Sequence, residues 1–320
     1  MRLSPIVPSM QIRSCGDSQP SITGIHFNLV YLHRYNMYEA YYNLKENPFS
    51  IQPDPDFLYF STKHAQAYAM MEYGIKNKSG FIVITGEIGC GKTTLIRHLL
   101  NNLPSEMNVG LVFNTHSEIA NLLEWIMLAF GLPYEGMSTV ALYDAFQRFL
   151  IEQYGLEKGV LLIIDEAQNL SSAALESLRM LSNINADKHQ LLQIMLVGQP
   201  QLRNLLMQPE LTQLTQRIEL DFYLKPFSED DVRKYIEHRL AIAGRETPLF
   251  TSEACARIAE ASQCVPRRIN VLCNLAMVYG FAAESEFIGL DLIEEVIRDK
   301  AESSAFTNKE PTQASLYTYP

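Results

Sequence analysis

Continuous apolar segments alternate with amphipathic ones from residue 37 to about residue 226. Phe81–Thr85 is an unbroken aromatic and β-branched run, which is typical of a strand buried on both faces. The same character predicts strands at Val109–Asn114, Val160–Asp165, Leu192–Gly198 and Ile218–Leu224. Helical spacing marks the segments between them, Thr93–Leu103, Ile119–Phe130, Ala141–Tyr154 and Ala173–Ile184. This alternation predicts an α/β fold in which helices cover both faces of a parallel sheet.

The pattern changes after residue 226, where the predicted strands stop. Ser228 followed by acidic residues has the form of a helix N-cap and first turn, and that helix should end near Ala243-Gly244. Three more helices are predicted at Ser252–Ala261, Arg267–Glu284 and Leu290–Asp299. We therefore expect a core at residues 37–226, a small all-helical module at 227–300 and a flexible tail at 301–320.

Residues 1–36 lack helical and strand periodicity, and we expect a poorly ordered leader there. Patterned sequence begins abruptly at Met37, which leaves two interpretations open. Either Met37 is the biological start, or the leader is translated as a genuine flexible tail.

Composition narrows the class of protein. Apolar residues make up 47% and charged residues 19%, which excludes a largely disordered chain. The net charge of −10 argues against a protein that coats nucleic acid non-specifically, because that requires clustered cations. The five cysteines form no CxxC pair, which suggests reduced thiols. No secretory signal or apolar run of membrane-spanning length occurs, so we expect a soluble, cytoplasmic protein.

The residues from Gly86 to Thr93 match the pattern GxxxxGK[ST] directly between a predicted strand and a predicted helix. Such a loop points backbone N–H groups at phosphate oxygens, and the helix N-terminus adds partial positive charge. Lys92 should reach the β- and γ-phosphates of ATP, and the Thr93 hydroxyl should ligate Mg²⁺. The expected nucleotide contacts are Gly86, Glu87, Ile88, Gly89, Cys90, Gly91, Lys92, Thr93 and Thr94. For Cys90, an oxidation-sensitive thiol and a small space-filler are both considered.

Two acids end the predicted strand Val160–Asp165. Phosphoryl transfer needs one carboxylate to organise Mg²⁺ and another to orient the attacking water. We assign the metal role to Asp165, through water, and the general-base role to Glu166. Asn114 is expected either to hold Glu166 by a hydrogen bond or to cap a turn.

These motifs resemble those of the AAA+ ATPases, in particular the ExeA/GspA type, which accompanies bacterial secretion, pilus and exopolysaccharide-export systems. The resemblance extends from about Met37 to Lys300. It rests on Met37-Tyr38, Asn47–Ser50, Pro53–Pro55, Phe57–Tyr59, Gly86–Thr94, Leu162–Gln168, Gln193–Leu202 and Val265–Asn270.

The resemblance implies further site residues. Gln199 is similar to a sensor-1 residue near the γ-phosphate, with a simple turn residue as the alternative. Arg217 resembles an arginine finger that reaches the neighbouring subunit's nucleotide, or else a solvated charge. Arg267 resembles the sensor-2 arginine of a lid, with Arg268 as the second choice. The adenine pocket is expected to be lined by Asn47, Pro48, Phe49 and Tyr59.

We therefore expect an oligomeric ATPase that couples nucleotide state to assembly of an envelope secretion, pilus or polysaccharide-export apparatus. Its partner would be an envelope-associated protein, which could place the chain at the inner membrane without a membrane segment of its own. Longer family members continue into a membrane span and a peptidoglycan-binding domain, whereas this sequence ends after the lid. The alternatives are a DNA-associated regulator of the TnsC or MuB type and a nucleotide-dependent scaffold that barely hydrolyses ATP.

Overall fold

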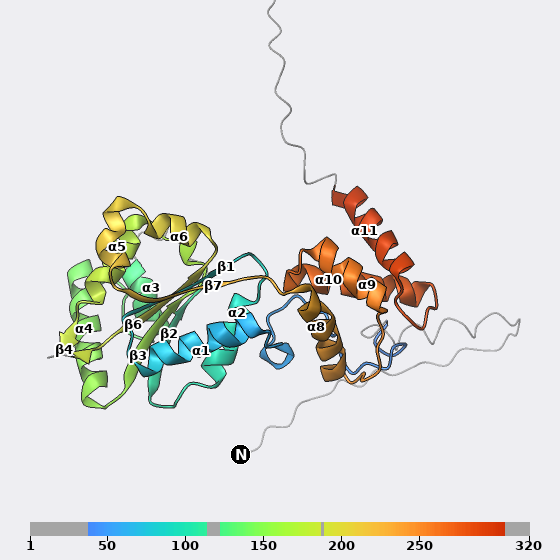
Figure 1. Cartoon of the computed structure of the whole chain (residues 1–320). Coiled ribbons are helices and arrows are strands. Elements are labelled where there is room, and N and C mark those ends of the chain that lie inside the picture. Colours follow the sequence, from blue (N-terminus) through green and yellow to red (C-terminus); the bar gives the residue numbers. More distant parts are fainter. Residues whose placement is uncertain (1–37, 114–121, 187–188, 305–320) are drawn as a thin grey trace, which may run out of the picture. The chain divides into compact units, whose positions relative to one another are not determined.

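The computed structural model describes residues 38–113, 122–186 and 189–304. The predicted leader, Asn114 and residues 305–320 of the predicted tail therefore lie outside the described residues. A five-stranded sheet has the order β2-β3-β6-β1-β7 (Figure 1), and its neighbouring strands all pair in parallel. The strands are β1 (Phe81–Gly86), β2 (Met107–Val112), β3 (Gly159–Ile164), β6 (Gln193–Gly198) and β7 (Ile218–Leu224). The prediction of a parallel sheet is confirmed.

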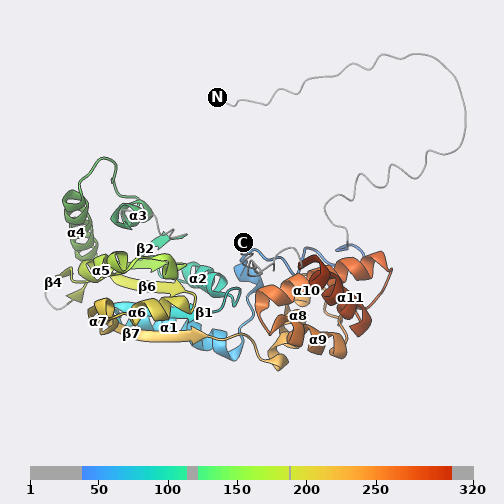
Figure 2. The same cartoon turned by 90° about the horizontal axis from the view of Figure 1, so that it is seen from above.

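Alternate residues of the central strands face two different hydrophobic clusters. In β3, Leu162 and Ile164 belong to one cluster, whereas Leu161 and Ile163 belong to the other. Helices α1 (Thr62–Lys76) and α2 (Lys92–Asn101) complete the second cluster. The first is completed by α3 (Leu122–Ala129), α4 (Thr139–Gly155), α5 (Ser172–Leu181), α6 (Gln201–Leu206) and α7 (Thr212–Thr215). Figures 1 and 2 show these helices around the sheet, and the continuous apolar strands follow from burial on both faces.

Short elements complete the connections between these helices and strands. They are the 3₁₀ turns η1 (Pro55–Phe57), η2 (Ala167–Asn169) and η3 (Pro209–Leu211) and the antiparallel pair β4 (Asn185–Ala186) and β5 (His189–Gln190). Among the helices of the described residues, none combines the length and apolar content needed to cross a lipid bilayer.

Helix α1 was not predicted from the sequence. Its buried positions do have helical spacing, but three of them are His64, Ala67 and Gly74 rather than large apolar residues. The small side chains allow close packing: a Cβ added at Gly74 would lie 2.5 Å from the Cδ1 atom of Ile82 in β1. A hydrophobic pattern built from small residues is weak, although one face of the helix is buried against the sheet.

The predicted helical module consists of α8 (Glu229–Ile242), α9 (Ser252–Ser262), α10 (Pro266–Ala282) and α11 (Leu290–Ser304). Ser228 caps α8 as predicted, in a capping box with Asp231. Helix α11 continues beyond the predicted end at Asp299. The four helices share a hydrophobic cluster of their own.

The segment that opens the described chain packs into this same cluster. Its contributing side chains are Tyr38, Tyr42, Leu44, Phe49 and Phe57. The sequence pattern places these residues in the core at 37–226, whereas their side chains are buried among α8–α11. The physical reason is the apolar surface area removed from water. Large aromatic side chains are stabilised most by such burial, and the helical module provides an apolar surface for them.

His64 joins α1 to the loop that follows β1. It is buried, its Nε2 atom lies 2.9 Å from the carbonyl oxygen of Cys90, and its Nδ1 atom lies 2.8 Å from the Ser61 hydroxyl. Because a carbonyl only accepts, Nε2 carries the proton and donates, and Nδ1 accepts from Ser61. Burial lowers the pKa of His64 below its ordinary value of 6.5. The folded protein therefore holds this imidazole neutral.

Gly86→Ala should lower the free energy of unfolding by about 1–3 kcal/mol, because overpacking against rigid atoms is costly. The added Cβ would lie 2.6 Å from the backbone carbonyl oxygen of Leu224 in the neighbouring strand β7. Urea unfolding measures the change. Gly155→Ala is the matched control, because a Cβ there meets nothing within 4 Å and stability should not fall. Equal stabilities of the two variants would contradict the prediction.

His64→Gln should flatten the dependence of stability on pH. The pKa of His64 in the folded state is below the unfolded value of 6.5. The contribution of the neutral imidazole to the free energy of unfolding is therefore complete above pH 6.5. It is lost as the pH falls from 6.5 through the lower folded pKa, because the unfolded chain binds the proton first. Glutamine has a donor amide and does not titrate. Unfolding in urea between about pH 7 and 5 should show a steeper decline for the wild type. Parallel curves would contradict this assignment.

Candidate nucleotide-binding site

The loop from Gly86 to Lys92 turns tightly between the end of β1 and the start of α2. Gly89 and Gly91 have φ angles of +83° and +91°, in the left-handed region that favours glycine. Gly91 is the N-cap of α2 and no side chain caps that helix. The backbone N–H groups of its first turn thus face the loop, which is the arrangement that binds phosphate in proteins.

Lys92 folds back onto this loop. Its Nζ atom donates to the carbonyl oxygens of Gly86 at 2.7 Å and Glu87 at 3.0 Å, and the residue is only 6% exposed. Burial lowers the pKa of Lys92, and the nearby carboxylates of Asp165 and Glu166 oppose that effect. The side chain therefore places a positive charge beside the glycine-rich turn.

The side chains of Thr93 and Asp165 are in contact. Thr93 lies in the first turn of α2, and Asp165 directly follows β3. The Thr93 hydroxyl donates to Oδ2 of Asp165 at 2.8 Å. Burial raises the pKa of Asp165, while the hydrogen bonds from Thr93 and from the N–H of Glu166 oppose the rise. Two hard oxygen donors this close suit Mg²⁺, which keeps several waters and takes few protein ligands. Consistently, the described residues contain no cluster of three or more His, Cys, Asp or Glu side chains arranged to hold a metal.

Glu166 stands in a left-handed turn directly after Asp165, with a φ of +55°. Its Oε2 atom accepts from Nε2 of Gln168 at 2.6 Å and from Nε2 of Gln199 at 3.1 Å. The Gln199 side chain comes from the end of β6, so the predicted sensor residue does reach the predicted base. Two amides thus hold one carboxylate oxygen of Glu166 at the edge of the sheet.

Gln168 is a site residue that received no role from the sequence. Its Oε1 atom accepts from the backbone N–H of Gln199 at 2.9 Å, so its amide nitrogen must face Glu166. A Cβ at Gly198 would lie 2.7 Å from this Oε1 atom, which explains glycine at the end of β6. Two sequence signals point to Gln168: its position shortly after the paired acids, and its place at the end of the motif Leu162–Gln168.

Cys90 is fully buried in the cluster between α1, α2 and the sheet. Burial raises the pKa of its thiol to about 11, and this effect outweighs the nearby positive charge of Lys92. Of the two interpretations considered, the structure favours the small space-filling side chain.

A cavity lies between the phosphate loop and the helical module. The loop side is lined by Ile88, Gly89, the residues from Gly91 to Thr94, and Glu166. The module contributes Tyr235, Arg239, Pro266, Arg267 and Asn270. The N–H of Arg267 donates to the carbonyl oxygen of Gly89 at 3.2 Å. A Cβ at Gly89 would lie 2.6 Å from the Cβ of Arg267, so only glycine allows this contact.

The two candidate lid arginines occupy different places. Arg267 lines the cavity, whereas Arg268 is hydrogen-bonded to the side chain of Gln263 and does not line it. Geometry thus favours Arg267 for the predicted phosphate contact.

The residues predicted to line the adenine pocket lie elsewhere. Phe49 is 1% exposed and packs edge-on against Phe250 within the helical module. Asn47 donates to Asn274, and Tyr59 donates to Asp231. The cavity is lined instead by the residues from Ser50 to Asp54, directly after the predicted motif. Phe49 was assigned to the pocket because of its motif, but its large apolar ring is more stable in the module's core.

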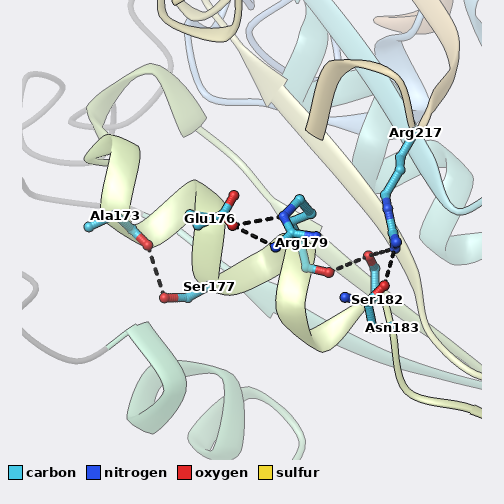
Figure 3. Close-up of polar contacts among 7 residues, drawn as sticks. All are labelled: Ala173, Glu176, Ser177, Arg179, Ser182, Asn183 and Arg217. Carbon is cyan, nitrogen blue, oxygen red and sulfur yellow. Dashed lines mark hydrogen bonds and ion pairs between the residues drawn. The ribbon is translucent and has the colours of Figure 1, made fainter. Parts of the chain in front are cut away.

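Arg217 directly precedes the amino end of β7. The phosphate loop lies at the other end of the strands, where the carboxyl end of β1 is found. Parallel pairing places Ile218 beside Phe81 and Leu224 beside Gly86, so roughly 20 Å of strand separates Arg217 from Gly86. The Arg217 guanidinium donates to the Ser182 hydroxyl at 2.9 Å and to the side chain of Asn183, at the end of α5 (Figure 3). Arg217 is therefore too far away to contact the loop of its own subunit.

Comparison with known proteins gives two direct matches. Residues 75–206 match the family model described as an AAA domain. General secretion pathway protein A of Aeromonas hydrophila is 40% identical over 253 residues, which cover 79% of this chain and 46% of that protein. The chain thus spans about half the length of this relative.

Solved structures share the fold at 16% sequence identity. Drosophila ORC bound to DNA has a TM-score of 0.61 and covers 94% of this chain and 72% of its own. The Aeropyrum pernix ORC2 protein has a TM-score of 0.55, with coverages of 74% and 67%. Cdc6p from Pyrobaculum aerophilum has a TM-score of 0.54, with coverages of 74% and 66%. With its AAA domain and its secretion-pathway relative, this chain belongs to the AAA ATPases of the ExeA/GspA type.

Proposed function

We propose that this chain binds and hydrolyses ATP, and that its nucleotide state controls the assembly of a bacterial envelope secretion, pilus or polysaccharide-export system. One observation carries the hydrolytic part of the proposal. Lys92, the Thr93–Asp165 pair and the Glu166 carboxylate held by two amides all stand at one edge of the sheet. These are the charges and donors that phosphoryl transfer requires.

Binding would begin with exchange of partners at the loop. The triphosphate would accept from the N–H groups at the start of α2, and Lys92 would leave the carbonyl oxygens of Gly86 and Glu87 for phosphate oxygens. Thr93 and Asp165 would hold Mg²⁺, Asp165 through water. When bound there, the ion would supply positive charge that offsets the negative charge of the phosphates.

Hydrolysis would depend on Glu166. Gln168 and Gln199 hold its carboxylate oxygen, which fixes where the other oxygen can accept a proton from water. Gln199, already within hydrogen-bond distance of Glu166, would lie near the attacking water. A positioned general base of this kind contributes about 10²–10⁴-fold to a rate.

The helical module would respond to the nucleotide through Arg267. Its N–H is bonded to Gly89 inside the loop, so a rearranged loop would also displace the start of α10. Loss of the γ-phosphate would then change the contact between module and core, which is a hinge-type switch.

The cellular role rests on the relative. That protein is a general secretion pathway protein, and this chain spans about half its length, so the envelope partner and the peripheral inner-membrane location are part of the proposal. The net charge of −10 counts against the TnsC- or MuB-like alternative. A salt-dependent DNA gel shift with an ATP analogue separates the two, because tight binding at moderate salt would favour the DNA-associated regulator.

Glu166→Gln should lower ATP turnover at least about 100-fold and leave ATP affinity nearly unchanged, because only proton acceptance is lost. Lys92→Ala should instead weaken ATP binding itself. Phosphate release and nucleotide-binding calorimetry measure the two effects. Glu152→Gln, an exposed residue of α4, is the matched control. Equal phosphate release by wild type and Glu166→Gln would remove Glu166 from the reaction.

Arg217→Ala should lower turnover about 10³-fold while ATP binding persists, as expected for a charge that acts on a neighbour's transition state. Mixing Arg217→Ala with Glu166→Gln subunits should restore activity, because some interfaces then combine an intact Glu166 with an intact Arg217. Arg148→Ala, whose side chain is 72% exposed, serves as control. If no mixing ratio restores turnover, action across subunits is wrong.

A further inference from the structure

Arg239 is a buried arginine that faces the candidate nucleotide cavity. It lies in the last turn of α8, is 6% exposed, and lines the same cavity as Lys92 and Thr93. Its guanidinium lies over the ring of Phe57, with the Cζ atom 4.6 Å from the ring centroid. The described residues include no acidic side chain within ion-pair distance of it.

Hydrogen bonds fix the orientation of this guanidinium. Its Nε atom donates to the carbonyl oxygen of Pro48, and Nη1 donates to the Tyr235 hydroxyl at 3.0 Å. Because arginine only donates, that hydroxyl accepts from Nη1 and donates its own hydrogen bond to Oδ1 of Asn270, 2.7 Å away. Asn270 in turn donates to the carbonyl oxygen of Ser50 at 3.0 Å. The donor and the acceptor of each of these hydrogen bonds are therefore determined.

The remaining nitrogen, Nη2, is buried and has no hydrogen-bond partner among the described residues. A buried charged donor normally has a partner, because desolvation without one is unfavourable. We propose that the partner is a ring nitrogen of the purine base of bound ATP, so that Arg239 reads the base. This inference rests on the proposed ATP binding and adds a specificity-determining residue to it.

The surroundings of Arg239 favour the base over the phosphates. A bound triphosphate would have the loop N–H groups, Lys92 and Arg267 as partners at the Gly89 end of the cavity, where these residues lie. Arg239 stands instead among the rings of Phe57 and Tyr235 and the backbone carbonyl of Pro48. Aromatic faces and fixed polar groups of this kind are typical of pockets for flat organic ligands.

The single nitrogen without a partner in the described part of the chain also indicates which purine base fits the site. Guanine presents two adjacent acceptors, O6 and N7, which a guanidinium usually binds with two nitrogens. Nε and Nη1 of Arg239 each already donate one hydrogen bond, so Nη2 is its one nitrogen without a partner among the described residues. One remaining donor nitrogen matches a single ring nitrogen, as adenine offers beside its amino group.

The test uses ATP and three deaza analogues, which replace N1, N3 or N7 by carbon and keep the triphosphate. Calorimetry should show that the full-length wild type binds one analogue at least about tenfold more weakly than ATP, as for loss of a charged hydrogen bond. Arg239→Lys should bind ATP more weakly by a similar factor and no longer distinguish that analogue. Arg233→Lys, on the same helix with a side chain 57% exposed, should behave as the wild type does.

Two results would overturn the proposal. One is equal binding of ATP and all three analogues by the wild type, which needs no variant to fold. The other is an unchanged preference in Arg239→Lys, since a purely structural role would lower the melting temperature and leave relative affinities alone. If the wild type binds neither ATP nor any analogue, or Lys92→Ala binds ATP normally, the proposed function fails rather than this inference.

Discussion

The parallel order of three neighbouring strands is the constraint on which the site depends. In a parallel sheet each helix returns the chain, so the carboxyl ends of β3, β6 and β1 meet at one edge. The loop after β1 brings Lys92 and Thr93, the turn after β3 brings the paired acids, and the end of β6 brings Gln199. The 2.8 Å contact of Thr93 with Asp165 and the 3.1 Å contact of Gln199 with Glu166 depend on this strand order, in which β6 lies between β3 and β1 and pairs with both.

Close backbone approach is the second requirement, and glycine meets it at three places. Gly86 lies against the carbonyl of Leu224, Gly89 against Arg267, and Gly198 against Gln168. At each position a Cβ would come within 2.7 Å of a neighbouring atom. The first contact fixes the loop on the sheet, the second couples it to the helical module, and the third makes room for the amide that holds Glu166. The proposed nucleotide binding, switching and water activation would thus share one tightly packed region.

The two edges of the sheet have different roles in the proposed mechanism. The edge with the phosphate loop gathers the catalytic groups of one subunit, while Arg217 at the other edge is held by neutral partners at the end of α5. A charge placed there cannot contact the phosphate loop of its own subunit, so the proposed finger role of Arg217 requires a second subunit. This separation gives a physical reason why an ATPase of this design would need to assemble, and why its activity would report on its partners.

The sequence by itself determined the elements whose signals are local. The β-branched runs specified the five strands, the glycine pattern specified the phosphate loop, and Ser228 specified the start of α8, because each depends on neighbours along the chain. Only the tertiary structure decided what depends on packing between distant segments. Examples are helix α1, built on small buried residues, the burial of Phe49 in the helical module, the position of Arg267 at the cavity, and the amide of Gln168 against Glu166. Such contacts join residues far apart in sequence, and no local pattern of apolar and polar positions encodes them.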